Sequence, residues 1–418
     1  MRRLIHTPEG VRDIYGIECD RKRYLERRIE KLLRSYGYQS IETPSFEFFD
    51  VFGKDVGTIA SRNLYKFFDH EGNTLVLRPD FTPSIARAAA MYFHEEQLPL
   101  RLCYHGSVFI NNSSYQGRLK ESTQMGVELL NDDGPAADAE LIALVVSIMQ
   151  TAGLTEFQVS VGQVDYFDSL VEEAGMDEDT VEELRKLLVI KNRFGAEELI
   201  SRLGLRKDLE EAFRQIPELF GNREMLERAK KLTENRRARA AVERLEKIAD
   251  ILTEYGCSQY VSYDLSMVSQ YSYYTGIIIQ AYTYGTGDAV IKGGRYDRLL
   301  EKFGKSAPAV GFTTEVDSLL SAIERQNIQL PIADIKTMVL YPERLEKMAV
   351  RFANAHRERQ MDVACIRSEP GRVLDDYRAF GQRNQFGGII YFRSEEEVYA
   401  INLASGEVSP VDVTPFRD

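Results

Sequence analysis

One long segment of the chain, residues 171–255, is rich in Glu, Lys, Arg and Leu and holds few β-branched residues, a composition that favours helices. Strand-like runs with turn residues between them precede this segment and return after it. We therefore interpret the segment as a helical subdomain inserted into a sheet domain. Because the strands of that domain follow one another as hairpins, the sheet is expected to be antiparallel.

The length of the chain predicts more than one domain. Its 418 residues exceed the roughly 250–300 residues that one hydrophobic core serves. Pro331 marks a linker, after which strand-like and helix-like segments alternate as in a small α/β domain. We expect an α+β protein with a sheet domain at residues 1–330, its helical insertion at about 171–255, and an α/β domain at 331–418.

Apolar periodicity and turn residues divide both domains into elements. Strands are expected at residues 38–52, 64–69, 74–77, 101–112, 118–130, 157–161, 260–265, 274–284 and 289–292, and in the second domain at 336–341, 361–366 and 387–392. Helices are expected at residues 21–36, 83–92, 136–152, 296–303 and 314–325, and then at 345–357 and 372–382. Asp80 and Thr82 would then lie at a corner between a strand and a helix.

Charge and composition argue against several classes of function. The net charge is −12 and the pI is near 5.2, whereas nucleic-acid affinity depends on Lys and Arg, so a tRNA partner is not favoured. The four cysteines and five histidines lack metal-binding spacing, and we expect reduced thiols, no metal and no cofactor. No apolar stretch approaches the roughly 20 residues that span a bilayer, and no signal peptide is recognisable. The protein is expected in the cytoplasm, without a membrane partner.

Four polar segments are placed where an antiparallel sheet would expose them together on one face. Gln124 and Glu128 are an even number of positions apart, so their side chains share one face of a strand. A carboxylate such as Glu128, with Gln124 and Asp80 nearby, holds an ammonium group or an imidazole N–H through charge-assisted hydrogen bonds. Taken singly, each residue is better explained as a solvated strand residue, and only their combination indicates a pocket. The segments are LVLRPDFT (75–82), GRLKESTQMGVE (117–128), SMVSQYSYYTG (266–276) and GGRYDRLL (293–300).

In this order the segments resemble the catalytic core of histidyl-tRNA synthetase, a class II aminoacyl-tRNA synthetase, and more closely a paralogous family, the regulatory subunits of ATP phosphoribosyltransferase. The likeness begins at TPEGVRD (7–13), includes YGYQSIETPSFE (36–47) where the first class motif belongs, and continues to SAPAVGFTTEVDSLL (306–320). Residues 331–418 are similar to an anticodon-binding domain in their strand-helix order alone, and we interpret them as a remnant reused for packing.

The resemblance implies an antiparallel sheet flanked by helices, and it implies roles for single residues. Asp80, Thr82 and Gln124 match residues that hold the α-ammonium group of histidine. Glu128 and Tyr274 match the contacts to the imidazole ring, with Tyr273 beside them.

The sequence departs from the synthetase pattern where that family activates its amino acid. Ile110 stands in place of the arginine of a Phe-Arg-x-Glu motif, and Ser269 and Ser318 align with two further arginines. Attack of a carboxylate on ATP gathers negative charge that such cations stabilise, and losing one donor typically costs on the order of 10²–10³ in rate. We therefore expect no activation. Arg118 and Arg295 persist at matching positions, and we interpret them as anchors of the hairpin and of the Gly-Gly turn.

The resemblance implies a non-catalytic regulatory subunit, required with a short-form ATP phosphoribosyltransferase catalytic subunit for the first step of histidine biosynthesis and mediating feedback by histidine. It also implies a homodimer through the first class motif, within a hetero-oligomer. Two other interpretations stay open: a diverged histidyl-tRNA synthetase that charges tRNA, and a stand-alone amino-acid sensor. The sequence also leaves open whether histidine acts in this pocket or at an interface with the partner.

Overall fold

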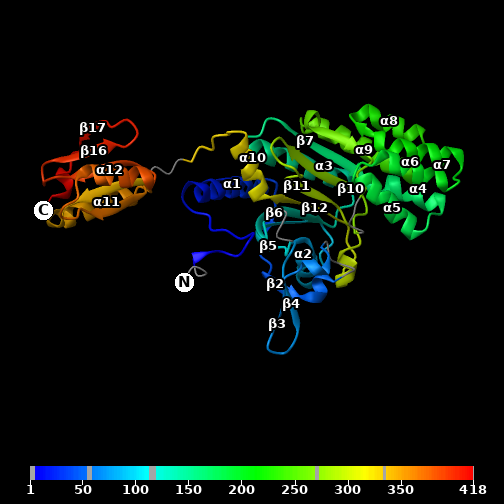
Figure 1. Ribbon diagram of the computed structural model, residues 1–418, viewed down its shortest axis with the longest axis horizontal. Helices are drawn as coiled ribbons and strands as arrows, with labels where there is room; N and C mark the ends of the chain where they lie inside the picture. Colours follow the sequence, from blue (N-terminus) through cyan, green and yellow to red (C-terminus); the bar gives the residue numbers. More distant parts are fainter. Residues whose placement is uncertain (1–4, 54–58, 113–118, 269–272, 333–335, 418) are drawn as a thin grey trace. The chain divides into compact units, whose positions relative to one another are not determined.

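Figure 1 shows the computed structural model, in which residues 5–53, 59–112, 119–268, 273–332 and 336–417 are described. The chain forms two compact units, one of residues 1–13 and 25–329 and the other of residues 14–24 and 330–418. Within the described ranges, no helix is long and apolar enough to cross a membrane, and no cluster of His, Cys, Asp and Glu is arranged to hold a metal ion.

The first unit is built on a nine-stranded sheet with the strand order β1-β5-β6-β12-β11-β10-β7-β9-β8. Neighbouring strands run antiparallel except for the pairs β1–β5 and β7–β9, which are parallel. The sheet is therefore mixed, with the antiparallel pairs expected from the hairpins in the majority. In sheet order the strands are Gln39–Ser40, Leu100–Phe109, Glu121–Leu130, Ala309–Glu315, Ile291–Arg295, Ile277–Thr283, Phe157–Gln163, Val261–Asp264 and Phe220–Gly221.

Helices pack on the sheet through apolar side chains at helical spacing. Helix α1 (Gly16–Ser35) buries Leu25, Ile29 and Leu33, which lie one turn apart on one face. Helix α3 (Pro135–Thr151) is apolar nearly all round because it lies between β7, β10 and β12 of the sheet and helix α9. Two further helices complete this part of the unit: α2 (Thr82–Tyr92) and α10 (Val316–Arg325).

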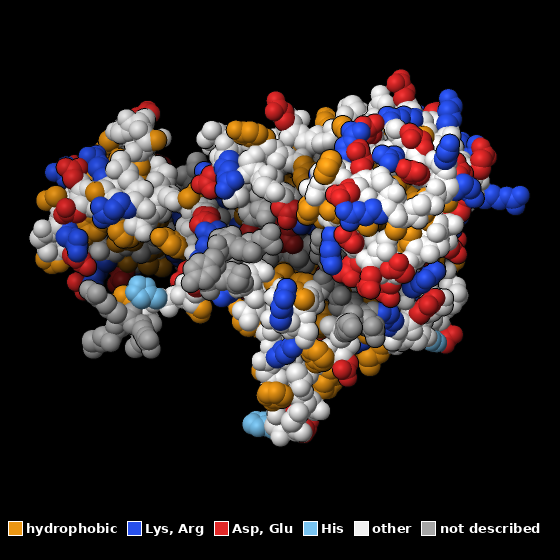
Figure 2. All heavy atoms as spheres, turned by 45° about the vertical axis from the view of Figure 1, so that its right-hand side comes forward, with side chains coloured by type: hydrophobic (Ala, Val, Ile, Leu, Met, Phe, Trp, Pro, Cys, Tyr) orange, Lys and Arg blue, Asp and Glu red, His pale blue; other side chains and the backbone are white. Residues whose placement is uncertain are grey.

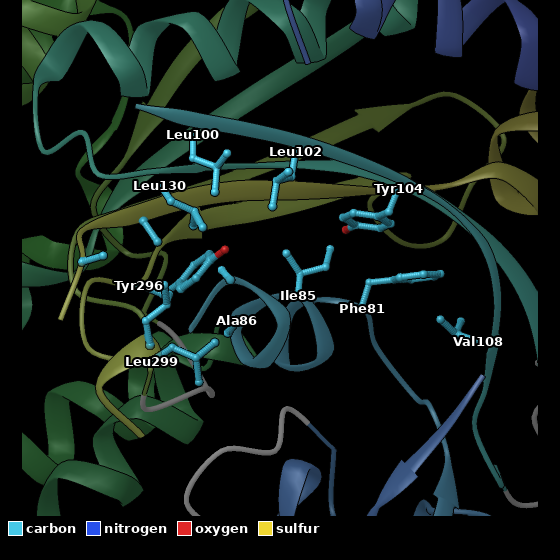
Figure 3. Close-up of a cluster of buried hydrophobic side chains, with 14 residues drawn as sticks. Phe81, Ile85, Ala86, Leu100, Leu102, Tyr104, Val108, Leu130, Tyr296 and Leu299 are labelled. Carbon is cyan, nitrogen blue, oxygen red and sulfur yellow. The ribbon is translucent and has the colours of Figure 1, made fainter. Parts of the chain in front are cut away.

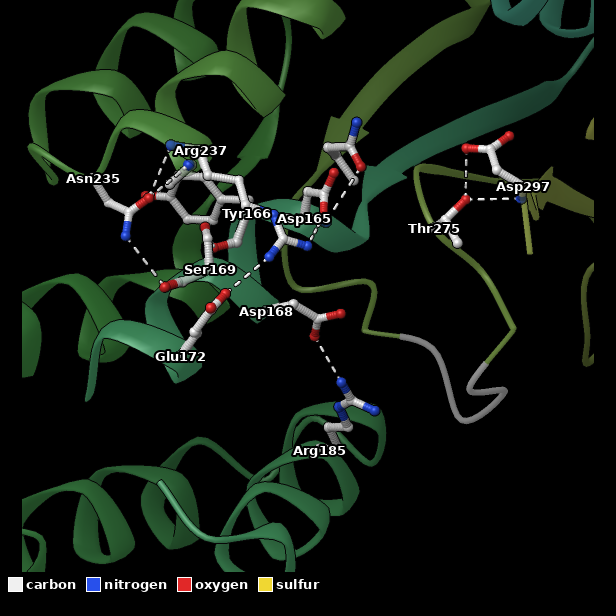
Figure 4. A network of polar contacts seen from close by, with 12 residues as sticks. Asp165, Tyr166, Asp168, Ser169, Glu172, Arg185, Asn235, Arg237, Thr275 and Asp297 are labelled. Carbon is white, nitrogen blue, oxygen red and sulfur yellow. Dashed lines mark hydrogen bonds and ion pairs between the residues drawn. The ribbon is translucent and has the colours of Figure 1, made fainter. Parts of the chain in front are cut away.

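The helical insertion is present as expected, and Figure 1 shows its helices gathered beyond one end of the large sheet. Arg237 at the start of α9 binds Glu172 of α4 at 2.9 Å, and Asn235 caps α9 while donating to the carbonyl of Ser169 at 3.2 Å (Figure 4). These contacts fasten the last helix of the insertion to its first. The helices are α4 (Val164–Ala174), α5 (Glu178–Val189), α6 (Arg193–Arg202), α7 (Lys207–Gln215), α8 (Arg223–Lys231) and α9 (Arg236–Glu254).

A small three-stranded sheet contains β2 (Phe46–Phe48), β4 (Thr74–Leu77) and β3 (Lys66–Phe68), in that order. The single strand expected at 38–52 is wrong, because the structure has β1 in the large sheet and β2 in the small one. Pro44 lies between them, and a proline cannot donate to a ladder. The carbonyls of Thr43 and Pro44 instead accept hydrogen bonds from Arg78 at 2.7 and 3.4 Å.

Two expectations near the end of the first unit are also corrected. Gly293 and Gly294 lie inside β11, and the helix expected at 296–303 is a single 3₁₀ turn at Leu300–Phe303. Strand β12 at Ala309–Glu315 was not expected from the sequence. The Gly-Gly pair suggested a turn, whereas in this sheet the glycines leave room above a strand.

The second unit contains a five-stranded sheet, with β13 parallel to β14 and β15 and the remaining pairs antiparallel. A small α/β domain was expected here, but β16 and β17 were not. Helix α11 packs on one cluster of apolar side chains and α12 on another. In sheet order the strands are Val363–Arg367, Lys336–Tyr341, Phe386–Phe392, Val398–Asn402 and Val408–Pro410, and the helices are α11 (Glu346–Arg357) and α12 (Leu374–Arg383).

Candidate ligand-binding pocket

Three residues lie directly opposite one another on neighbouring central strands: Glu128 on β6, Gly311 on β12 and Gly294 on β11. Directly paired residues direct their side chains to one face of a sheet. A Cβ atom at position 311 would lie 1.6 Å from Oε2 of Glu128, and one at position 294 would lie 2.6 Å from Cε1 of Tyr274. The two glycines therefore leave the space that the Glu128 carboxyl group and the Tyr274 ring occupy.

The Glu128 carboxyl group is buried between two hydroxyl groups. Thr82, the first residue of α2, donates to Oε1 at 2.7 Å, and the hydroxyl of Tyr296 donates to Oε2. The side chain is 1% exposed. Figure 3 shows Tyr296 on the α2 side of the sheet, in a cluster with Ile85 and Ala86, with its hydroxyl directed toward the strands.

Burial governs the protonation of this group. Burial raises the pKa of Glu128 from 4.5 to about 8, and the negative charge of nearby Asp80 also raises it. The two hydrogen bonds lower the pKa, but by less. At neutral pH the carboxyl therefore mostly carries a proton. In that state it can donate as well as accept a hydrogen bond.

The two consecutive tyrosines approach the carboxyl group through Tyr296. The ring centroids of Tyr273 and Tyr274 are 4.5 Å apart, and Tyr273 meets Tyr296 edge-on at 6.1 Å. A phenol and a carboxyl group thus share one side of the sheet, which suits a planar ligand ring with polar atoms at its edge.

A second polar pair lies further along the same face. Gln124 on β6 is directly opposite Glu315 on β12, and its Nε2 donates to Oε1 of Glu315 at 2.7 Å. Gln124 is 6% exposed, and its Oε1 is buried without a hydrogen-bond partner among the described residues. Burial raises the pKa of Glu315, while the hydrogen bond from Gln124 lowers it.

The structure brings all six predicted site residues to one side of the sheet. Five of them are joined by contacts that run through Tyr296, in the order Asp80, Thr82, Glu128, Tyr296, Tyr273 and Tyr274, with the Thr82 amide donating to Asp80 at 3.3 Å. Gln124 shares their face but bonds to Glu315 instead.

Tyr296 and Glu315 were not predicted as site residues, although both lie in the segments that carried the prediction. Once β12 is known to be a strand, the even spacing of Glu315 from Gly311 places both on one face. No comparable signal marks Tyr296, because it lies just after β11, where the alternation of the strand no longer applies.

Two of the three positions at which the synthetase pattern has an arginine, 110 and 318, are among the described residues. Ile110 is half-buried just after β5, and Ser318 is exposed on α10. Ser269 and Arg118 lie outside the described residues. Arg295 follows Gly294 on β11 and so points to the opposite face, where it binds Asp138 of α3 at 2.7 Å. These contacts anchor β11 to α3, whereas the Gly-Gly turn that Arg295 was expected to anchor is part of strand β11.

Known proteins match this chain over nearly its full length. The family model for histidyl-tRNA synthetase matches residues 10–319. The ATP phosphoribosyltransferase regulatory subunit of Acetivibrio thermocellus is 40% identical over 410 residues, 98% of each chain, and that of Ruminiclostridium cellulolyticum is 37% identical over 96% of this chain and 95% of its own. A solved structure of an ATP phosphoribosyltransferase regulatory subunit/histidyl-tRNA synthetase from Bacillus halodurans has a TM-score of 0.84 and 32% identity over 93% of this chain and 98% of that one.

These matches confirm the expected class II synthetase-like fold, with its sheet flanked by helices and its C-terminal sheet domain. They extend across both compact units, so the relatives are not matched by an isolated domain. The chain belongs to the family of ATP phosphoribosyltransferase regulatory subunits, within the wider histidyl-tRNA synthetase family.

Proposed function

We propose that this chain is the non-catalytic regulatory subunit of a hetero-oligomeric ATP phosphoribosyltransferase, and that its pocket binds histidine as the feedback ligand. The observation that carries the proposal is the buried Glu128 carboxyl group, held between Thr82 and Tyr296 on a face with Tyr274. An ionised carboxylate and a phenol can pair with the two imidazole nitrogens, and they select against side chains without those groups.

The pocket offers little to a transferring phosphate. Arg78 packs on Phe81, and its guanidinium donates to the backbone carbonyls of Ser107 and Thr43 at 2.8 and 2.7 Å. Arg295 is directed to the other face. Isoleucine at 110 and serine at 318 supply no positive charge where class II chemistry requires it. These features support a sensor of an amino acid over an enzyme that activates one.

The small sheet supports the proposed homodimer. Phe46, Phe48 and Phe68 are more than half exposed in the isolated chain. Figure 2 shows hydrophobic side chains on the projecting part of the molecule that carries β2, β3 and β4. Aromatic side chains grouped in this way are typical of surfaces that a partner covers. We assign the surface to a second copy, because YGYQSIETPSFE, which includes Phe46, resembles the first class motif.

The first test is copurification with a short-form catalytic subunit, followed by assay of phosphoribosyl transfer to ATP with and without histidine. We expect the catalytic subunit to be active only with this chain, and histidine to inhibit the assembled enzyme. Isothermal titration of the chain alone should show histidine binding, and absence of heat at saturating histidine would remove the pocket from the proposal. A histidine-dependent ATP–pyrophosphate exchange activity in the purified chain would instead favour a diverged synthetase.

A further inference from the structure

The pairing of Gln124 with Glu315 fixes the orientation of a buried amide. An ionised carboxylate only accepts hydrogen bonds, so the amide must turn its Nε2 toward Glu315, and the 2.7 Å contact joins those atoms. The other end of the amide, Oε1, is then an acceptor directed away from Glu315. This oxygen is buried, and the described residues leave it without a partner.

A buried acceptor without a partner on the pocket face indicates a missing donor. The groups that influence Glu315 are Asp80, Asp317 and Gln124, together with Lys292 on the neighbouring strand. Lys292 itself binds Asp288 at 2.9 Å and is exposed. Carboxylates therefore outnumber cations around Glu315, the hydrogen-bond partner of this amide, which favours a positively charged donor over a neutral one.

We infer that Glu315 is a positioning residue for a ligand amine: it holds Gln124 so that the amide oxygen receives the ammonium group of an amino acid whose ring lies at Glu128. This inference rests on the proposed function and adds to it a determinant of specificity. Glu315 need not contact the ligand, because its effect is transmitted through the Gln124 amide.

Two substitutions separate this role from a simple charge effect. Glu315→Gln keeps a side-chain oxygen that accepts from Gln124, so histidine affinity should stay within about threefold of wild type. Glu315→Leu removes the acceptor and should weaken histidine binding about tenfold or more, the size expected for one charge-assisted hydrogen bond. Glu324→Leu, at an exposed position on α10, is the matched control and should bind as wild type. Thermal melting of each variant establishes that it is folded.

The ligand panel distinguishes positioning from a collapse of the whole pocket. Titrations with histidine, with histamine, and with imidazolepropionate, which lacks the amine, are compared in competition. Glu315→Leu should weaken the two amines and leave imidazolepropionate within about twofold of its wild-type affinity, because the imidazole end is untouched. Histamine retains the amine without the carboxylate, so its loss should parallel that of histidine.

The possible results distinguish failure of the Glu315 inference from failure of the proposed function. An unchanged histidine affinity in Glu315→Leu overturns the inference, as does an equal loss in Glu315→Gln and Glu315→Leu, or an equal loss for imidazolepropionate. If wild-type protein binds none of the three ligands, the proposed function itself fails. That outcome is separate from the failure of Glu315 alone, in which wild-type binding is intact.

Discussion

At the scale of single residues, the pocket is dominated by a carboxyl group kept where water does not reach it. Charged groups prefer water, and the two hydroxyl donors of Thr82 and Tyr296 compensate only part of the loss for Glu128. The side chain is therefore retained at some expense of stability. A buried carboxyl group that costs stability in the empty pocket is expected of a residue whose role is to bind a ligand.

The first prediction concerns stability as a function of pH. The unfolded chain releases the Glu128 proton near pH 4.5, and the native state keeps it up to about pH 8. Between these values the native state binds the extra proton, so the contribution of this group to the free energy of unfolding falls as pH rises and is lost above about 8. Glu128→Gln lacks this term and should gain stability relative to wild type across the window, by up to roughly 5 kcal/mol.

Urea denaturation of wild type and Glu128→Gln near each end of the window checks this prediction. Glu156→Gln, at an exposed position before β7, should show no such pH-dependent difference. If the difference in free energy of unfolding between wild type and Glu128→Gln were the same at all pH values, it would contradict a raised pKa of Glu128.

The second prediction concerns histidine affinity. Because the carboxyl must ionise to accept the imidazole N–H, binding should release a proton below the pKa of about 8. Affinity should then rise by up to about tenfold per pH unit from near 6.5 toward 8 and level off above it. Calorimetry in two buffers of different ionisation enthalpy measures the released proton, and a flat profile through this range would argue against a protonated Glu128 in the empty pocket.

At the scale of elements, the pocket depends on the register of strands β6, β12 and β11, which places Glu128, Gly311 and Gly294 side by side in one row across the sheet. The glycines at 311 and 294 are what allow a carboxyl group and an aromatic ring to lie directly on the sheet. A slip of one residue would turn Glu128 to the opposite face of the sheet, where Val127 and Leu129 are now fully buried.

The third prediction follows from this row. Gly311→Ala places a methyl carbon 1.6 Å from Oε2 of Glu128, so the carboxyl must move away from Tyr296 and Thr82. Histidine affinity should fall at least tenfold, while the sheet persists. Calorimetry measures the first effect and circular dichroism the second. Gly287→Ala, where an added Cβ meets nothing within 4 Å, is the control.

The sequence predicted most elements, and the six candidate site residues that it singled out lie on one side of the sheet, but it did not predict how they are connected. Apolar alternation identified β5 and β6, and the spacing of Gln124 and Glu128 placed both on one face. Strand β12 was missed because its glycine and three threonine or glutamate residues give no clear alternation. Tyr296 was missed because its hydrogen bond to Glu128 joins residues 168 positions apart, and local patterns do not report such contacts.

At the scale of the whole molecule, one buried aspartate joins the sheet to the helical insertion. Asp138 of α3 is fully buried and receives Arg295 from β11 at 2.7 Å and Arg244 from α9 at 2.6 Å. Breaking a buried ion pair leaves an uncompensated charge and is strongly destabilising, whereas exposed pairs contribute little. The insertion is therefore fixed to the pocket-bearing sheet by charge as well as by apolar packing.

The fourth prediction compares these two kinds of pair. Asp138→Asn keeps the shape but removes the charge from both guanidinium groups, and should lower the free energy of unfolding by about 3 kcal/mol or more. Arg237→Ala, which removes half-exposed pairs with Asp165 and Glu172 in the insertion, should cost less than about 1 kcal/mol. Chemical denaturation of both variants measures the two losses in free energy of unfolding. Equal losses would show that the buried ion pairs of Asp138 do not stabilise the protein more than the half-exposed pairs of Arg237.

The central position of β12 has a consequence for how the chain folds. Tyr104 and the carbonyl of Phe312, 208 positions apart, meet across the middle of the sheet, so β12 can join β6 only after synthesis of the whole insertion. Contacts between such distant segments close slowly, because chain entropy is lost before they form. During translation the hairpin of β5 and β6 exposes an open edge. The row of Glu128, Gly311 and Gly294 is complete only when β12 pairs with β6. A nascent chain truncated before residue 309 can carry Glu128, Gln124 and the helices of the insertion, yet it lacks Gly311 and Glu315, which lie opposite Glu128 and Gln124 in the complete sheet.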